Sequence, residues 1–258
     1  MAAWLNLLKA NLKKEYLELK RYLPNTIAMI LTFYIIFLGL FGVIQIVGDP
    51  TTQDANTQYV IVNYIFWFLA FSIINSIGYE ILNEAMRGTL EQLSMSPMGI
   101  WRIMAVRLIS TTIINLIIVI ILLHISMATA GQWLNVDVVT LAPIMLLTLI
   151  GMFGISFIIA GITIIVKQIQ AFLQILQFIL MALTFIPISL SPIIQFLPFV
   201  KGIDMVREVM IHGVGLSQFA VYDFVVLIVN ALFYFVLGLA IFIYCERVAM
   251  QKGLLAHY

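Results

Sequence analysis

The sequence predicts an all-α polytopic membrane protein, on the strength of two observations. Of its 258 residues, 63% are hydrophobic and only 10% are charged, whereas soluble domains are about 45–50% apolar and roughly 25% charged. The chain also contains six long runs without a charged residue, each long enough to cross the roughly 30 Å of a bilayer core as a helix. These runs are residues 22–48, 55–79, 108–136, 138–166, 168–200 and 224–245.

The composition also argues against other classes of protein. Disordered chains are polar and poor in aromatic residues, whereas 12% of this chain is aromatic. A net charge of +1 provides no basic face for nucleic acid. The single cysteine, Cys245, can form neither an internal disulfide nor a metal site by itself. We therefore expect no bound metal and no nucleic-acid partner.

The first predicted element is an amphipathic helix over residues 1–23. At helical spacing its leucine and aromatic side chains share an arc of about 120°, with basic residues beside that arc. Such a helix suits the cytoplasmic membrane interface, with its apolar face toward acyl chains and its cations near anionic lipid headgroups. Whether it also contacts a protein partner is open at this point. The expected interface residues of this elbow are Trp4, Lys9, Lys13, Lys14, Lys20 and Arg21.

A single transmembrane domain of six spans follows over residues 24–247, and residues 248–258 form a short tail. The fifth charge-free run is too long for one span and contains Pro187, Pro192 and Pro198, each of which removes a helical hydrogen bond. We therefore expect a helix over about 168–186. The rest of the run, to residue 200, should either lie at the membrane interface or dip back into the membrane, packed against protein, because lipid cannot satisfy the hydrogen bonds of a broken backbone.

Basic residues set the expected orientation. Lysine and arginine are concentrated in the cytoplasmic loops of membrane proteins. If the six spans start from a cytoplasmic N-terminus, eleven of the 13 basic residues fall on the cytoplasmic side, and only Lys201 and Arg207 fall outside. We expect a multi-pass protein of the plasma membrane, of a prokaryotic cell, with both termini in the cytoplasm.

The segment after the second span carries signals for a helix stop. Glu80, Glu84 and Arg87 share one face if the second helix continues below the membrane, and Glu84 with Arg87 would form an i,i+3 ion pair. Gly88 suits the left-handed position that follows a helix C-terminus. We therefore expect the second helix to end here.

A new helix is predicted to begin immediately after this stop. Thr89 and Gln92 have the spacing of a capping box that begins a short helix at Leu90. This helix can extend only to about residue 95, because Ser96 and Pro97 have the pattern of a second cap with proline in the first helical position. The pattern fits a short helix presented to a partner, although a capped connector without a partner would show it too.

The string from Glu84 to Pro97 resembles the E-x-x-RGTLE-x-L-x-x-(S/T)P signature of ABC-2 type permeases, the membrane subunits of a class of ABC exporters. Pro198, Asp204 and Arg207 resemble a second, less specific pattern of that family, P-x(5)-D-x-x-R, although Leu197 replaces its usual asparagine. The resemblance implies that residues 90–95 form a coupling helix that docks on an ATP-binding subunit. It also implies that residues 187–200 form short re-entrant helices near the outer mouth, between the fifth and sixth spans. The implied coupling residues are Glu84, Arg87, Gly88, Thr89, Leu90, Glu91 and Gln92.

No P-loop sequence occurs in the chain, so ATP and Mg²⁺ are expected on two copies of a separate ATP-binding subunit. Six spans would form half of a translocation path, which a second copy or a paralogue would complete. We expect no catalytic residue in this chain. The substrate expected for this exporter is amphipathic or hydrophobic, such as a drug, a lipid-linked glycan or a peptide.

Polar residues inside the spans are candidates for lining that path. They form one stripe on the second span and one on the fifth, and polar groups at this depth face either a cavity or another helix. Both interpretations are open from the sequence. The stripe residues are Ser72, Asn75, Ser76, Gln170, Gln174 and Gln177. A further group of glycines is expected to allow close helix contact, namely Gly39, Gly42, Gly151, Gly154 and Gly161.

Two rival functions have less support. An ion-coupled secondary transporter usually needs ionisable groups within the membrane, and this chain keeps its acidic residues near the ends of its spans. An integral membrane enzyme that modifies lipids would need a cluster of catalytic side chains, and none is evident in the sequence.

Overall fold

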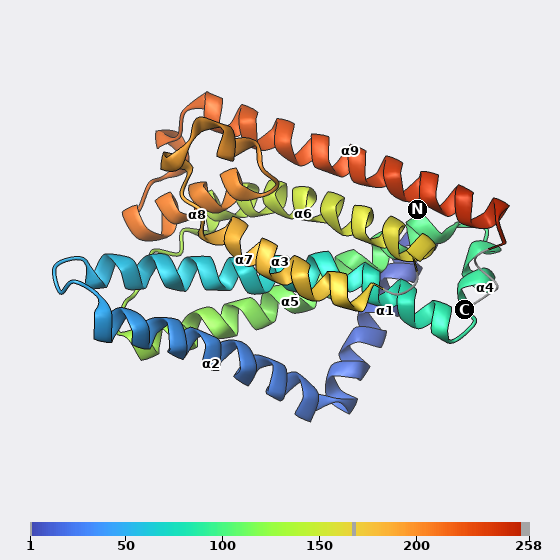
Figure 1. Ribbon diagram of the computed structural model, residues 1–258, viewed down its shortest axis with the longest axis horizontal. Coiled ribbons are helices and arrows are strands. Elements are labelled where there is room, and N and C mark those ends of the chain that lie inside the picture. The colour runs from blue at the N-terminus through green and yellow to red at the C-terminus, as the bar shows by residue number, and fades with distance from the viewer. Residues whose placement is uncertain (1, 167–168, 254–258) are drawn as a thin grey trace.

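The computed structural model describes residues 2–166 and 169–253, and these residues form helices joined by short connections (Figure 1). The α-helices are α1 (Ala2–Arg21), α2 (Leu23–Val47), α3 (Gln53–Met86), α4 (Leu90–Ser94), α5 (Ile100–Ala130), α6 (Val138–Val166), α7 (Gln170–Phe185), α8 (Val200–His212) and α9 (Val221–Gln251). The 3₁₀ helices are η1 (Ile188–Leu190), η2 (Pro192–Phe196) and η3 (Leu216–Gln218). The predicted all-α polytopic class is confirmed.

Five of these helices, α2, α3, α5, α6 and α9, are long and apolar enough to span a membrane. The fifth expected span corresponds to α7, which has 16 residues and a length of about 24 Å at 1.5 Å per residue. Gln168, with which this span was expected to begin, lies outside the described residues, as do Lys167, Met1 and residues 254–258 of the expected tail.

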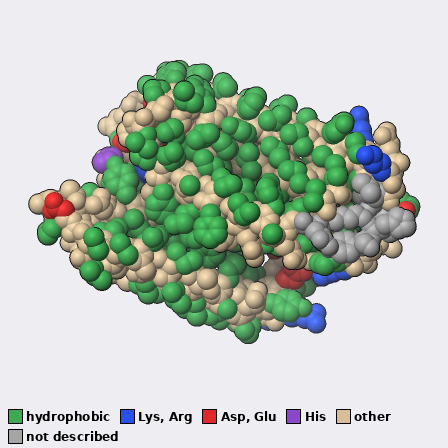
Figure 2. Space-filling model, in the orientation of Figure 1, with side chains coloured by type: hydrophobic (Ala, Val, Ile, Leu, Met, Phe, Trp, Pro, Cys, Tyr) green, Lys and Arg blue, Asp and Glu red, His purple; other side chains and the backbone are tan. Residues whose placement is uncertain are grey.

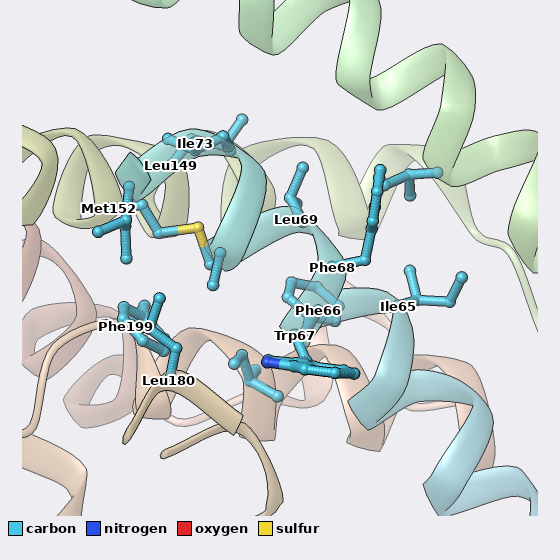
Figure 3. Packing of buried hydrophobic residues seen from close by; sticks show 14 of the residues in the cluster. Ile65, Phe66, Trp67, Phe68, Leu69, Ile73, Leu149, Met152, Leu180 and Phe199 are labelled. Atoms are coloured by element: carbon cyan, nitrogen blue, oxygen red, sulfur yellow. The ribbon is translucent and has the colours of Figure 1, made fainter. Parts of the chain in front are cut away.

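The bundle is built around α3, which packs against α2, α5, α6, α7 and α8. A helix that is apolar on all sides is stable only where neighbours cover all of them. Figure 3 shows this packing: Phe66, Trp67 and Phe68 of α3 point in different directions, and Leu180 of α7 and Met152 of α6 approach from other helices. The Trp67 indole N–H donates to the backbone oxygen of Gln177 at 3.1 Å, which satisfies a buried donor.

Helices α6 and α9 form the most extensive helix pair, and glycines bring them together. A Cβ on Gly154 would lie 2.6 Å from the backbone nitrogen of Phe235, and one on Gly161 would lie 3.2 Å from Cα of Phe242. The expectation of close contact is wrong for Gly39 and Gly42, because a Cβ there would meet nothing within 4 Å among the described residues.

The segment between α7 and α8 turns at its three prolines. Pro187 precedes η1, Pro192 begins η2, and Pro198 precedes the turn into α8. The expectation that this segment is packed holds only in part within this chain: Phe199 and Val200 are buried, whereas Leu190 and Ile193 are exposed.

Side chains of α9 instead satisfy the backbone of η2. The Asn230 amide donates to the Gln195 oxygen at 2.6 Å, and the Tyr234 hydroxyl donates to the Phe196 oxygen at 3.0 Å. The broken backbone is therefore hydrogen-bonded by polar side chains of α9, while Leu190 and Ile193 face outward.

Charge is distributed unequally between the two ends of the bundle. We call them the α4 end, which also carries α1, and the α8 end, which also carries the α2–α3 connection (Figure 1). On the face in Figure 2, most visible Lys and Arg side chains lie at the α4 end, and hydrophobic side chains cover much of the middle. The α4 end is therefore where charged groups of the chain could meet a polar partner.

Candidate functional site

The candidate site lies at the α4 end, where α3 stops at a glycine. Gly88 has φ of +69°, the left-handed conformation expected from the sequence. Its N–H donates to the Ala85 oxygen at 3.1 Å, and the Thr89 N–H donates to the Glu84 oxygen at 3.0 Å. This pair of bonds is the Schellman motif, which satisfies the last carbonyls of a helix.

The short helix α4 follows directly and presents a polar surface. It covers Leu90–Ser94, so the prediction of a helix over 90–95 is correct to within one residue. Leu90 is buried and anchors α4 against the bundle. Glu91 and Gln92 are exposed, and Met95 just after the helix is 72% exposed. The outward face therefore combines an acid, an amide and a flexible thioether.

Two local details differ from the sequence-based expectation. The capping box is absent, because the Thr89 hydroxyl donates to the Glu84 carboxylate and no side chain caps α4. Ser96 and Pro97 form a turn, and α5 begins only at Ile100. The N–H of Ile100 donates to the buried Glu246 carboxylate of α9 at 3.3 Å, so α9 supplies the cap.

A network of charges joins three helices beside α4. One guanidinium nitrogen of Arg107 (α5) lies 2.7 Å from Glu84 and 2.9 Å from Glu80, both on α3. Lys14 of α1 lies 3.3 Å from Glu80. The expected Glu84–Arg87 ion pair is wrong: Glu84 binds Arg107, and Arg87 is exposed. We call Lys14, Glu80, Glu84 and Arg107 the charge network.

The charge network is partly shielded from solvent and ties α4 to its supports. The side chains of Glu84 and Arg107 are mostly covered, and Nε of Arg107 is buried without a partner among the described residues. Charges in such surroundings depend on their partners, since removing one partner leaves a costly unpaired ion. Glu84 also bonds Thr89, the residue before α4. The position of α4 is thereby linked to α1 and α5.

Helix α1 uses its polar face to contact the bundle. Lys14 reaches α3, and the Thr111 hydroxyl of α5 donates to the Glu15 carboxylate at 3.2 Å. Burial raises the pKa of Glu15, an effect that nearby Lys14 and the Thr111 hydrogen bond partly offset. Most expected elbow residues are exposed, namely Trp4, Lys9, Lys13, Lys20 and Arg21, and Lys14 is partly buried.

The expected path residues do not form one cluster within this chain. On α3, Asn75 is buried and its Nδ2 donates to the Phe71 oxygen at 2.9 Å, while its Oδ1 has no partner among the described residues. Ser76 donates to the Ile73 oxygen at 2.8 Å, and Ser72 is partly buried.

On α7 the stripe lies largely on the surface. Gln170 and Gln174 are exposed and Gln177 is partly buried. The glutamines are therefore open to solvent, lipid or a second chain.

The α8 end contains two buried cations. Arg207 is 4% exposed, and its guanidinium donates to Asn63 Oδ1 at 2.7 Å and to the Thr184 oxygen at 2.5 Å. Lys201 is 8% exposed and pairs with Asp223 at 2.7 Å. These contacts fix α8 on α3, α7 and α9.

Sequence reasoning missed Arg107, Glu246 and Arg207 as structural ions. Arg107 and Glu246 each adjoin a long apolar run, a position that signals a charge needing a partner. Their partners lie on other helices, 23 and 146 residues away, so local spacing could not have identified them. No group of three or more His, Cys, Asp or Glu in residues 2–166 and 169–253 is placed to hold a metal ion.

Comparison with known proteins gives one result that covers most of the chain. The family model described as "ABC-2 family transporter protein" matches residues 6–240. No curated protein matches the sequence. The matched region includes α2 to α8 and most of α1 and α9.

Proposed function

The chain belongs to the ABC-2 family of transporter proteins, and on this premise we propose that it is the membrane-spanning subunit of an ATP-driven exporter. Members of this family are multi-pass membrane proteins that serve as transport subunits and associate with an ABC ATP-binding subunit. The proposal adds outward transport and coupling through α4.

The geometry of α4 is the observation that supports coupling. A short helix is isolated by a glycine stop before it and a turn after it, and it exposes Glu91, Gln92 and Met95. The charge network holds the preceding residues against α1 and α5. A push on α4 would therefore be transmitted to several helices at once, because packed elements shift as units.

The proposed assembly contains two ATP-binding subunits, which hold ATP and Mg²⁺, and a second permease copy or a paralogue. Only 11% of the residues in the most apolar stretch of α2 are buried, and Phe172, Ile175 and Phe178 of α7 are exposed. Lipid and the second copy would cover these surfaces. Between two copies, the exposed Gln170 and Gln174 of α7 would line a path suited to an amphipathic substrate.

We further propose that both termini lie in the cytoplasm and that the α4 end faces the ATP-binding subunits there. The basic residues at this end fit the bias of cytoplasmic loops. The cell membrane of a prokaryote is the proposed location.

The test is co-purification from native membranes, with the captured subunit identified by its P-loop sequence and ATPase activity. Glu91→Lys and Met95→Glu place unfavourable charges on the outward face of α4 and are expected to reduce the captured ATPase at least tenfold. Ser217→Lys is the matched control, since it changes an exposed residue of the short helix η3 at the opposite end. A complex that survives both α4 substitutions would exclude α4 as the coupling element.

A further inference from the structure

A cleft of about 570 Å³ lies between α1 and the residue that ends α3. Its charged lining consists of Lys13, Lys14, Arg21 and Arg87 with one carboxylate, Glu18. The volume is within the range of small-molecule sites. Four cations around one concavity, with a single acid, create a field that attracts an anion.

Most of these cations have no carboxylate partner of their own. Lys14 is engaged, at 3.3 Å from Glu80 and 3.8 Å from Glu18. Within the part of the chain that the structure describes, Lys13, Arg21 and Arg87 form no ion pair. The Arg21 guanidinium lies over the Tyr22 ring, 5.6 Å from its centroid, which holds it at the cleft.

An apolar surface leads away from the cleft. Leu17 and Tyr22 line the cleft and are exposed, and α2 begins at the next residue. Leu23, Ile27 and Leu31 then expose a strip of side chains along the first turns of α2. A ligand that satisfies the whole surface has an anionic head and long apolar tails. A free anion would use only the cleft.

We propose that this cleft binds the phosphate headgroup of an anionic phospholipid whose acyl chains lie along α2. The lipid would join α1 to Arg87, the residue that caps the end of α3 immediately before the glycine stop. Arg87 thereby acquires a lipid contact in place of the ATPase contact inferred from its sequence motif. A lipid bound in the cleft would hold the end of α3, which leads into α4, against α1.

The test is native mass spectrometry of the full chain with added phosphatidylglycerol or phosphatidylcholine. Wild-type protein is expected to retain phosphatidylglycerol selectively. Arg87→Gln and Lys13→Gln should each lower this retention about fivefold, the size expected for one basic residue at an anionic lipid surface. The matched controls are Arg102→Gln and Lys252→Gln, exposed cations outside the cleft lining, and these should retain the lipid.

Several results would overturn the proposal. Equal retention of the two lipids by wild-type protein would exclude a headgroup site, and equal losses in cleft and control variants would indicate diffuse surface charge. Displacement of the lipid by inorganic phosphate alone would indicate a free-anion site. Loss of the ATP-binding subunit from the Arg87→Gln variant with unchanged lipid retention would assign the cleft to that subunit. Thermal unfolding checks that each variant is folded, and Lys13→Gln tests the cleft independently of α3.

Discussion

Gly88 shows how one residue determines where α4 begins. Its φ of +69° is unfavourable for any residue with a Cβ, although a Cβ there would meet nothing within 4 Å among the described residues. Gly88→Ala should therefore lower the free energy of unfolding by about 1 kcal/mol through backbone strain alone. Denaturant unfolding in detergent measures the change. Gly88→Asn is the control, because asparagine tolerates this conformation better, and an equal loss in both variants would contradict the explanation.

Arg107 is the residue on which the charge network depends. Arg107→Met leaves Glu80 and Glu84 facing each other without their shared partner, and we expect a loss of about 3 kcal/mol in unfolding free energy. Adding Glu84→Gln should recover part of this loss, because it removes one unpaired charge.

The control for this prediction is Arg102→Met, since Arg102 is exposed and contacts the Trp101 ring at 5.1 Å. Thermal unfolding of the purified chain compares the variants. If Arg102→Met were as destabilising as Arg107→Met, or if Glu84→Gln gave no recovery, the charge network would not be a stabilising unit.

Among the elements, the α6–α9 pair is the most sensitive to added volume. A Cβ on Gly238 would lie 2.9 Å from Cα of Gly154, so the two backbones are in direct contact. Gly154→Ala and Gly238→Ala must push the helices apart, at an expected cost of about 1–3 kcal/mol. Gly39→Ala on α2 is the matched control, expected to be neutral or slightly stabilising because its surroundings are open. An unfolding midpoint that is lower for Gly39→Ala than for Gly154→Ala and Gly238→Ala would contradict this account.

The start of α5 shows why some element boundaries could not be predicted. Pro97 fits the first position of a helix and the second position of a turn equally well, because both require φ near −65°. The structure has the turn, and α5 starts at Ile100. The decisive contact is the Glu246 cap from α9, which no local pattern of residues 96–100 contains. Helix α8 was missed for a similar reason, since its buried Arg207 is stabilised by distant Asn63.

For the whole molecule, composition and charge-free runs were sufficient to predict an all-α membrane bundle. The runs predicted α6 as residues 138–166 and the short α4 to within one residue, because chain polarity and glycine conformation act locally. The site was predicted less completely. Glu84 was identified, but its partner Arg107 depends on how α3 and α5 pack, and packing partners cannot be determined from the spacing within one helix.

The number of membrane spans depends on whether α7 crosses the membrane. Trp67 of α3 bonds Gln177, whereas Arg207 bonds both Asn63 of α3 and Thr184 of α7. As the residue number rises along α7, that of its α3 neighbour falls, so α7 runs antiparallel to α3 from the α4 end toward the α8 end (Figure 1). Although α7 alone is shorter than a typical membrane core, this direction leads us to predict that it crosses the membrane.

Cysteine labelling tests this crossing in intact cells. In a Cys245→Ser background, single cysteines replace the exposed residues Gln92, Ser217 and Lys252 and react with a membrane-impermeant maleimide. Six spans place residue 217 outside and residues 92 and 252 inside, so only the first should be labelled before lysis. If α7 does not cross, residue 252 reacts from outside and residue 217 does not. That pattern would reduce the chain to five spans and place its two ends on opposite sides, because each crossing reverses the side of everything that follows it.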